Sequence, residues 1–164
     1  YGTALHALLE NLPQVSEPDR PRVAQRLLAG NDPVIATEAL AQAQHLLAQP
    51  DLAEIFGPNS LAEVEIIAAP AEFDGAQLTG SIDRLLIQPD HILAVDFKSN
   101  RVVPDRAEDT PDGILRQLGA YAAALSDLYP DQRIDTAIPW TQTGTLMTIP
   151  HEIVRDALRN TAIS

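Results

Sequence analysis

Leucines at helical spacing dominate the first fifty positions of the chain. Four of them lie three or four positions apart before Pro13: Leu5, Leu8, Leu9 and Leu12. This spacing predicts a first helix with one buried stripe. A second helix is predicted from about Asp19 to Ala29, before Gly30, which can adopt the left-handed conformation that ends a helix. Asp32-Pro33 supplies an N-cap and a first-turn proline for a third helix that runs to about Ala48.

Alternating apolar and polar residues replace this pattern after residue 60 and predict strands. Leu61–Ala69 is the first predicted strand. Leu78–Ile87 and Ile92–Lys98 are the next two, joined by a tight turn at Gln88–His91. Three consecutive strands with short connections predict an antiparallel meander.

The remainder of the chain mixes helix and strand. Arg101–Pro111 is polar and contains prolines, which predicts a loop, and a helix is predicted from Pro111 to Leu128. Strands at Ile134–Thr141 and Thr145–Ile149 precede a closing helix at His151–Asn160. This order predicts an α/β fold with a mixed central sheet flanked by helices and with a helical amino-terminal part. At 164 residues the chain fits one domain, residues 1–164.

The turn between the second and third strands fixes which of their residues face each other. In a symmetric, even-membered turn centred on Pro89-Asp90, Ile87 faces Ile92, and the same register sets Asp83 opposite Asp96. Opposed side chains have Cβ atoms roughly 4.5–5.5 Å apart, so two carboxylates there repel each other unless something cancels their charge. A divalent cation would cancel it.

Lys98 adds an amine to this pair of carboxylates. It lies two residues after Asp96, and the strand period of two places both side chains on one face. Hard carboxylate oxygens suit Mg²⁺, which also binds substrate phosphate. The lysine can orient or deprotonate an attacking water, or stabilise charge that builds on a phosphate. An ordinary surface hairpin can carry the same triplet without any chemistry, and the facing Asp83 is what favours a site.

Three further side chains are candidates for the same site. Glu63 and Glu65 lie two apart on the first predicted strand, so either can be a further ligand. The alternative is that both belong to the charged solvent face of an edge strand. His6 lies beside the leucine stripe of the first helix, where an imidazole can be a metal ligand or a packing residue.

Gln117 and Tyr121 lie four residues apart on a predicted helix, so their side chains point the same way. An amide and a phenol on one helical face can bind phosphate or a base edge, and the ring can stack on an unpaired base. The alternative is a core tyrosine with its hydroxyl at the rim, beside an exposed glutamine.

Composition narrows the function classes. The chain has no cysteine, which excludes disulfides and thiolate-bound metals, and shows no signal peptide or membrane-spanning run, so we expect a cytoplasmic protein. The net charge of −12 argues against a domain that holds nucleic acid by bulk electrostatics. Because the sequence starts within a helical pattern, we expect it to be a domain of a larger protein.

Five short motifs occur in a fixed order: Gly2–His6, Ala62–Val64, Gly80–Arg84, Asp96–Asn100 and Gln117–Tyr121. Together they resemble the RecB-like branch of the PD-(D/E)xK nuclease superfamily, and within it the carboxy-terminal nuclease domains of bacterial helicase-nucleases of the alphaproteobacterial AddA type. The resemblance covers residues 1 to about 150. It implies a restriction-endonuclease-like fold and Mg²⁺-dependent cleavage of DNA, with Mn²⁺ or Ca²⁺ able to substitute in binding.

The resemblance also implies roles for individual residues. Metal ligands would be His6, Asp83, Asp96 and the backbone carbonyl of Phe97. The catalytic set would be Asp83, Asp96, Lys98 and Glu63, which matches the family pattern better than Glu65. Gln117 and Tyr121 would hold the DNA strand.

Partners follow from the same resemblance. The family implies an ATP-driven motor that feeds single-stranded DNA ends to the nuclease, and an AddB-type partner subunit, in double-strand-break repair by recombination. This chain contains no motor motif, so it is expected neither to bind ATP nor to unwind DNA. The alternative is a catalytically inactive nuclease-fold module that serves as a DNA-binding or protein-interaction scaffold. An inactive module would be expected to lose a ligand or the lysine, and none is missing.

Overall fold

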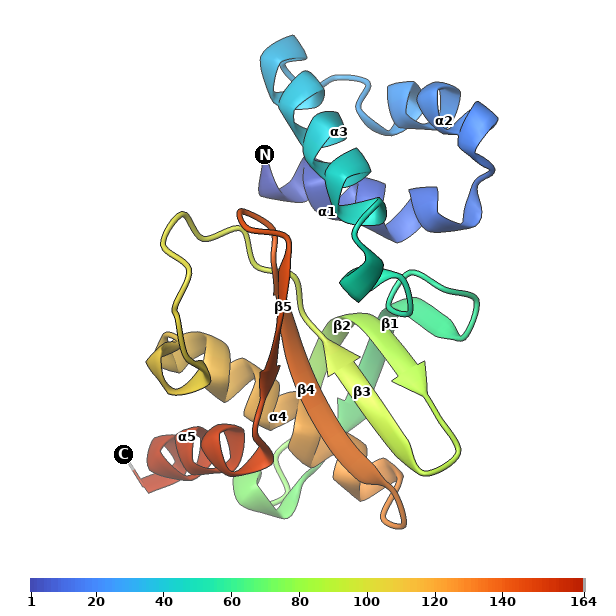
Figure 1. Cartoon of the computed structure of the whole chain (residues 1–164). Coiled ribbons are helices and arrows are strands. Elements are labelled where there is room, and N and C mark those ends of the chain that lie inside the picture. Colours follow the sequence, from blue (N-terminus) through green and yellow to red (C-terminus); the bar gives the residue numbers. More distant parts are fainter. Residues whose placement is uncertain (164) are drawn as a thin grey trace.

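A five-stranded sheet forms the centre of the computed structural model, which describes residues 1–163 except the side chains of Glu72 and of residues 161–163 (Figure 1). The strand order is β1-β2-β3-β4-β5. Its strands are β1 Ser60–Ala68, β2 Leu78–Ile87, β3 His91–Val95, β4 Arg133–Trp140 and β5 Thr145–Ile149. Only the β3–β4 pair is parallel. The predicted meander and mixed sheet are confirmed.

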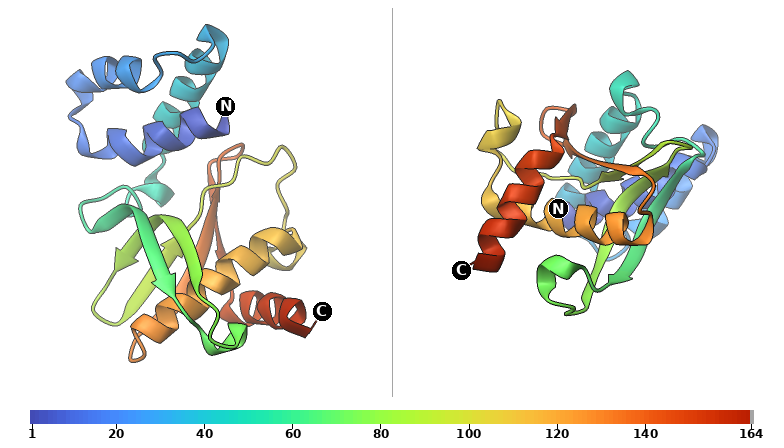
Figure 2. Two further views of the ribbon diagram at one scale, coloured as in Figure 1. Left: turned by 180° about the vertical axis from the view of Figure 1, so that it is seen from behind. Right: turned by 90° about the horizontal axis from the view of Figure 1, so that it is seen from below.

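Helices cover the sheet in two groups. They are α1 Gly2–Asn11, α2 Arg20–Leu27, α3 Pro33–Leu47, α4 Asp112–Leu128 and α5 His151–Ile163. Helices α1 to α3 gather at one end of the sheet, whereas α4 crosses one face with α5 beside it (Figures 1 and 2). The predicted α/β architecture with a helical amino-terminal part is confirmed. No helix in the described part of the chain has the length and apolarity needed to cross a membrane.

The helix starts follow from local chemistry, as α3 illustrates. The Asp32 carboxylate accepts hydrogen bonds from the backbone N–H groups of Val34 and Ile35, and Pro33 occupies the first turn. This is the predicted N-cap. Helix α2 ends at Leu27, two residues earlier than predicted, and α5 continues three residues beyond the predicted end.

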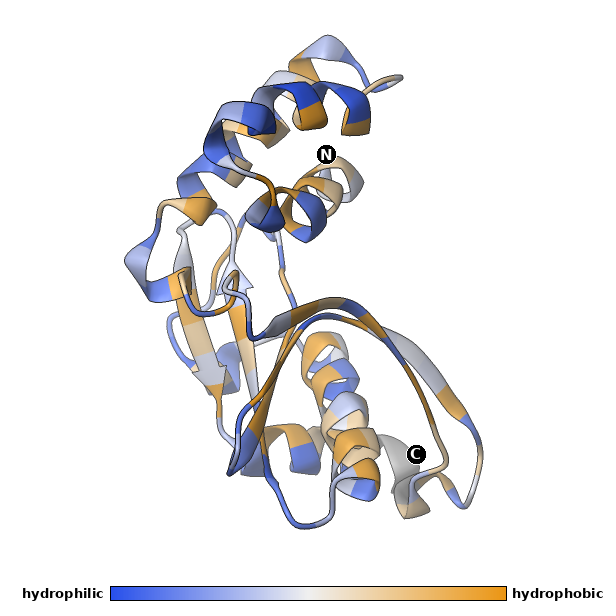
Figure 3. Cartoon of the chain, turned by 90° about the vertical axis from the view of Figure 1, so that its right-hand side faces the viewer, coloured by the Kyte–Doolittle hydropathy of each residue, from blue (hydrophilic) through white to orange (hydrophobic). Residues whose placement is uncertain are grey.

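Two hydrophobic cores hold the helices on the sheet. One joins α4 and α5 to the strands through residues such as Leu118, Ile92 and Trp140. The other joins the leucine stripe of α1 to Val95 and Phe97. In Figure 3 the strands are largely apolar, whereas hydrophilic positions are frequent on the amino-terminal helices. The site described below lies where the two cores meet.

The third strand ends three residues earlier than its predicted carboxyl end. We predicted it to continue to Lys98, but β3 ends at Val95, and the chain then follows β4 alone. The backbone N–H groups of Asp96 and Lys98 donate to β4 carbonyls, at 3.2 Å each. The Phe97 N–H points the other way and donates to Oδ2 of Asp83 at 2.8 Å. A side chain of β2 thus replaces the backbone partner that would have extended the ladder.

Candidate functional site

Asp83 and Asp96 face each other where β2 and β3 separate. The paired register runs from Ile87↔Ile92 to Arg84↔Val95, as the turn predicted, and the two aspartates occupy the next facing positions, just beyond the last pair of the ladder. Asp96 is only 4% exposed. Burial, followed by the charge of Asp96, raises the pKa of Asp83 from 3.8 to about 8. The fold therefore brings two carboxylates together in a buried environment, where ionisation of one opposes ionisation of the other.

The ammonium of Lys98 lies against this pair. Its Nζ is 2.7 Å from Oδ2 of Asp96, on the face of the sheet that α4 covers. Apart from this ammonium, that buried oxygen has no hydrogen-bonding partner among the described residues. Lys98 is also the only lysine in the sequence. The predicted convergence of two carboxylates and one amine is present.

Gln117 and Tyr121 of α4 hold the lysine from the other side. Lys98 Nζ donates to Oε1 of Gln117 at 3.0 Å, and Nε2 of Gln117 donates to the Tyr121 hydroxyl at 3.0 Å. That hydroxyl donates in turn to the Ser81 carbonyl of β2 at 2.9 Å. The only O–H of Tyr121 is donated to Ser81, so the hydroxyl must accept from the amide N–H of Gln117. The amide oxygen of Gln117 therefore faces Lys98, whose ammonium can only donate. The chain of bonds orients the amine, whereas contact of these two residues with DNA remains a prediction.

A glycine makes room for the tyrosine in this chain of bonds. The Tyr121 ring is 6% exposed, and a Cβ at position 80 would lie 2.9 Å from its Cε1 atom. Gly80 therefore allows the ring to reach the Ser81 carbonyl. Burial, and then the nearby Asp96, raises the pKa of the Tyr121 hydroxyl, so the hydroxyl stays protonated and can donate.

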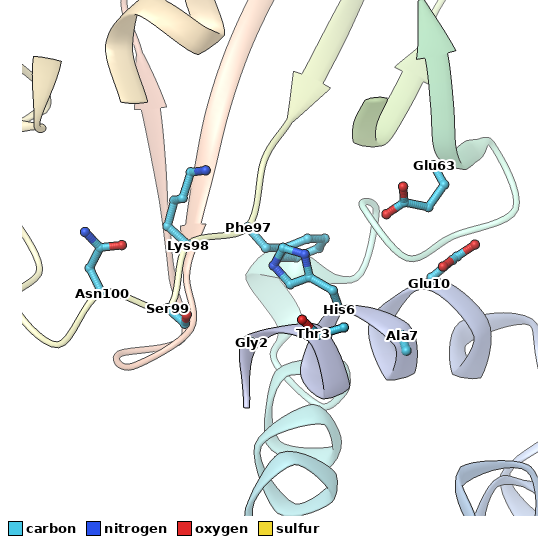
Figure 4. Close-up of a pocket in the computed structure, with 10 residues that line it drawn as sticks. All are labelled: Gly2, Thr3, His6, Ala7, Glu10, Glu63, Phe97, Lys98, Ser99 and Asn100. Carbon is cyan, nitrogen blue, oxygen red and sulfur yellow. The ribbon is translucent and has the colours of Figure 1, made fainter. Parts of the chain in front are cut away.

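His6 and Phe97 approach the carboxylates from the opposite face. Nδ1 of His6 lies 3.9 Å from Oδ1 of Asp83, and its ring packs edge-on against Phe97 (Figure 4). The Phe97 ring stacks on Phe56 with centroids 5.7 Å apart, which fixes the backbone at this point. The N–H and C=O groups of one residue point to the same side of an extended backbone, so we expect the Phe97 carbonyl to lie on the side of Asp83 as its N–H does.

Arg84 attaches the helix that carries His6, a role that the sequence pattern does not predict. Its guanidinium is buried and donates to the carbonyls of Leu9 and Glu10 at 2.9 and 3.1 Å. These are the unpaired carbonyls at the end of α1. The signal in the sequence was a second charged residue directly after Asp83, followed by the apolar run Leu85–Ile87.

Glu63 and Glu65 differ in the structure although they share a strand. Glu63 falls opposite Asp83 in the β1–β2 register but is left out of the ladder, because its φ is +47°. This conformation is uncommon for residues other than glycine. The Glu63 carboxylate accepts a hydrogen bond from the Ser81 hydroxyl at 2.8 Å. Glu65 is exposed and does not line the cavity that Glu63 borders.

A cavity of about 540 Å³ lies between α1 and the strand ends, and Asp83 and Asp96 are not among its lining residues (Figure 4). Glu63 and Glu10 border it on one side and Lys98, Ser99 and Asn100 on the other, with His6 between them. Its volume falls within the range of ligand-binding pockets, and His6 and Lys98 both line it.

The donor set fits a hard divalent cation. The described residues contain no group of three or more His, Asp or Glu side chains arranged as a ready-made cluster. Nevertheless, Asp83 and Asp96 supply facing oxygens, one of them otherwise paired only with Lys98, and His6 and the Phe97 carbonyl are nearby. Two carboxylates with few further protein ligands are the usual provision for Mg²⁺.

Comparison with known proteins identifies this arrangement. The model of the PD-(D/E)XK nuclease superfamily matches residues 1–154. The chain belongs to this superfamily. Its members are generally metal-dependent nucleases, and the sheet and helices described above are the restriction-endonuclease-like α/β fold.

Other comparisons are weaker than the PD-(D/E)XK match. No curated protein matches the chain significantly. The crystal structure of SSO0001 is similar with a TM-score of 0.42 and 13% sequence identity, over 97% of this chain and 73% of that one. The assignment to the superfamily therefore rests on the family match.

Proposed function

We propose that this chain is a Mg²⁺-dependent deoxyribonuclease that hydrolyses phosphodiester bonds, acting as an exonuclease on single strands. The observation that carries the proposal is the position of Lys98 Nζ, 2.7 Å from Asp96 and beside the cavity that His6 and Glu63 border. Metal-assisted hydrolysis of a phosphodiester needs carboxylates to hold the cation, and it is helped by a cationic group near the phosphate. Asp83 and Asp96 supply the carboxylates, and Lys98 supplies the cationic group.

Each residue of the site has a proposed role. Asp83, Asp96, His6 and the Phe97 carbonyl would hold Mg²⁺, with Mn²⁺ or Ca²⁺ able to replace it in binding. When bound, the cation polarises the phosphate and offsets the charge of the leaving oxygen. Lys98 orients the attacking water or stabilises charge on the phosphate.

Glu63 and Gln117 act on the groups around the reaction. Glu63 borders the cavity and can accept a hydrogen bond from water within it. Gln117 is bonded to Lys98, so we assign it the orientation of the amine, with Tyr121 holding the amide in place. Contact of both residues with the DNA strand is compatible with this role if the strand lies over Lys98.

The cellular setting that we propose follows from the order of the five motifs. It is the carboxy-terminal nuclease domain of an AddA-type helicase-nuclease, residues 1–164, which receives single strands from an ATP-driven motor and works with an AddB-type subunit in double-strand-break repair. The acidic chain, with a net charge of −12, supports delivery of DNA by a larger assembly, because the domain has little basic surface to capture DNA by itself.

The test is cleavage of end-labelled single-stranded DNA with Mg²⁺ by the parent chain, Asp96→Asn and Lys98→Ala. We expect the parent to cut and both variants to lose at least about a hundredfold in rate. Asp127→Asn, at an exposed position on α4, is the matched control and should cut like the parent. DNA binding without cutting by the parent would instead support the inactive scaffold.

A further inference from the structure

A second hollow opens beside the catalytic cavity, between Tyr1, α3, the segment after β3 and the turn from β4 to β5. It has a volume of about 620 Å³. Six of its lining residues can hydrogen-bond: Tyr1, Glu38, Gln42, Ser99, Arg101 and Gln142. Ser99 lines both hollows and directly follows Lys98. The two hollows are therefore neighbours, so a nucleotide strand that passes Lys98 can continue into the second hollow.

Arg101 supplies a positive charge at this entrance. It is exposed, and no acidic side chain in the described part of the chain lies within ion-pair distance of its guanidinium. An unpaired guanidinium in a chain of net charge −12 is available to an incoming anion. Arginine binds phosphate oxygens through two parallel hydrogen bonds, so a DNA phosphate suits this position.

Tyr1 supplies an aromatic surface in the same hollow. Its side chain is partly exposed, unlike the buried Tyr121. Stacking on an exposed aromatic ring is a general way to hold an unpaired base, because every base has a π face. The hollow therefore offers the Tyr1 ring for the base of a nucleotide and the Arg101 guanidinium for its phosphate.

The remaining polar groups favour a particular kind of base. Nε2 of Gln42 donates to the backbone carbonyl of Thr141, so its Oε1 atom is left to accept. The Glu38 carboxylate can only accept. Two acceptors complement an exocyclic amino group, which adenine, cytosine and guanine carry and thymine lacks.

We propose that this hollow binds the base next to the scissile phosphate, stacked on Tyr1, with its amino group at Glu38 and Gln42 and the flanking phosphate at Arg101. The inference rests on the proposed nuclease function and deepens it. The substrate is unpaired DNA in which A, C or G is preferred to T at this one position.

The test is binding of fluorescent hexanucleotides by the Lys98→Ala variant with Mg²⁺, measured by anisotropy. The parent probe is oligothymidine, in which each position in turn carries dA, dC or an abasic site. At one position dA or dC should bind about fivefold more tightly than dT. Adding Glu38→Leu, which leaves no acceptor on this side chain, should remove most of that preference, whereas Glu152→Leu on α5, the matched control, should keep it. Adding Tyr1→Ala should weaken base-bearing probes about tenfold but leave the probe that is abasic at that position unchanged.

Two results would overturn the inference. The first is that the chain without these substitutions cuts DNA, but Tyr1→Ala weakens abasic and base-bearing probes equally or Glu38→Leu keeps the preference. The hollow then does not bind a base, and only this inference fails. If that chain does not cut and no probe binds, the nuclease proposal fails and this inference fails with it.

Discussion

Asp83 and Asp96 occupy facing positions of two strands that separate at this point, and the Phe97 N–H group holds the Asp83 carboxylate there at 2.8 Å. The pair is costly in the folded protein, because burial and the second carboxylate both oppose ionisation of Asp83. Lys98 offsets part of this cost at Asp96. A bound divalent cation would offset the rest, which leads to the following predictions.

Metal binding should stabilise the protein through these two carboxylates. Mn²⁺ at about a hundred times its dissociation constant adds about 2.7 kcal/mol, which for a domain of this size raises Tm by about 5–10 °C. Asp83→Asn and Asp96→Asn should abolish most of this rise in a thermal melt. Asp127→Asn, exposed on α4, should retain it. An equal rise in all four proteins would place the ion elsewhere.

Stability without metal should fall as pH rises. The folded state raises the pKa of Asp83 from 3.8 to about 8, so folding favours the protonated carboxyl. The stabilisation that comes from protonating Asp83 is fully present below its unfolded pKa of 3.8. It is lost as pH rises through the folded pKa of about 8. Urea unfolding in EDTA at about pH 5 and about pH 8.5 should show a smaller decrease for Asp83→Asn than for the parent chain. A parent and variant with parallel pH profiles would contradict the raised pKa.

The fold was largely predictable because its helices and strands have strong local patterns. The leucine spacing of α1, the Asp32-Pro33 start of α3 and the even-membered turn after Ile87 each determined a structure that is observed. The site was predictable to the extent that it depends on the hairpin register. Its remaining contacts join distant segments, as Tyr121 joins Ser81, and no local pattern encodes them.

The unpredicted parts have identifiable physical causes. The third strand ends early because a side-chain oxygen of Asp83 takes the Phe97 N–H. Glu63 leaves its ladder through a positive φ, which the sequence does not reveal because glutamate rarely adopts it. The role of Arg84 depends on where α1 ends in space, which only tertiary packing fixes.

Gln117 should control the orientation of Lys98. Gln117→Leu removes the acceptor at 3.0 Å from Nζ, and we expect cutting to slow about tenfold, equivalent to about 1.4 kcal/mol. Tyr121→Phe, which keeps the ring, should have a smaller effect. Reductive ¹³C-methylation labels only Lys98 and the amino terminus, so the NMR signal of Lys98 should move in Gln117→Leu. Gln44→Leu on α3 is the control, and an unmoved signal in Gln117→Leu would contradict the assignment.

Arg84 should couple protein stability to the position of His6. Arg84→Met removes two hydrogen bonds to the end of α1, and we expect a loss of about 2–4 kcal/mol in the free energy of unfolding. Urea unfolding measures this loss. Because α1 carries His6, the same variant should also bind Mn²⁺ more weakly in a calorimetric titration at a temperature where it remains folded. Lower stability with unchanged affinity would limit Arg84 to a structural role.

The most direct test of the account is the location of a bound cation. Crystals grown with Mn²⁺ and measured at its absorption edge should show an anomalous peak between the carboxylates of Asp83 and Asp96, beside Lys98 and within reach of His6. A well-ordered site without a peak, or a peak held by other residues, would contradict the claim that these two aspartates share a metal ion.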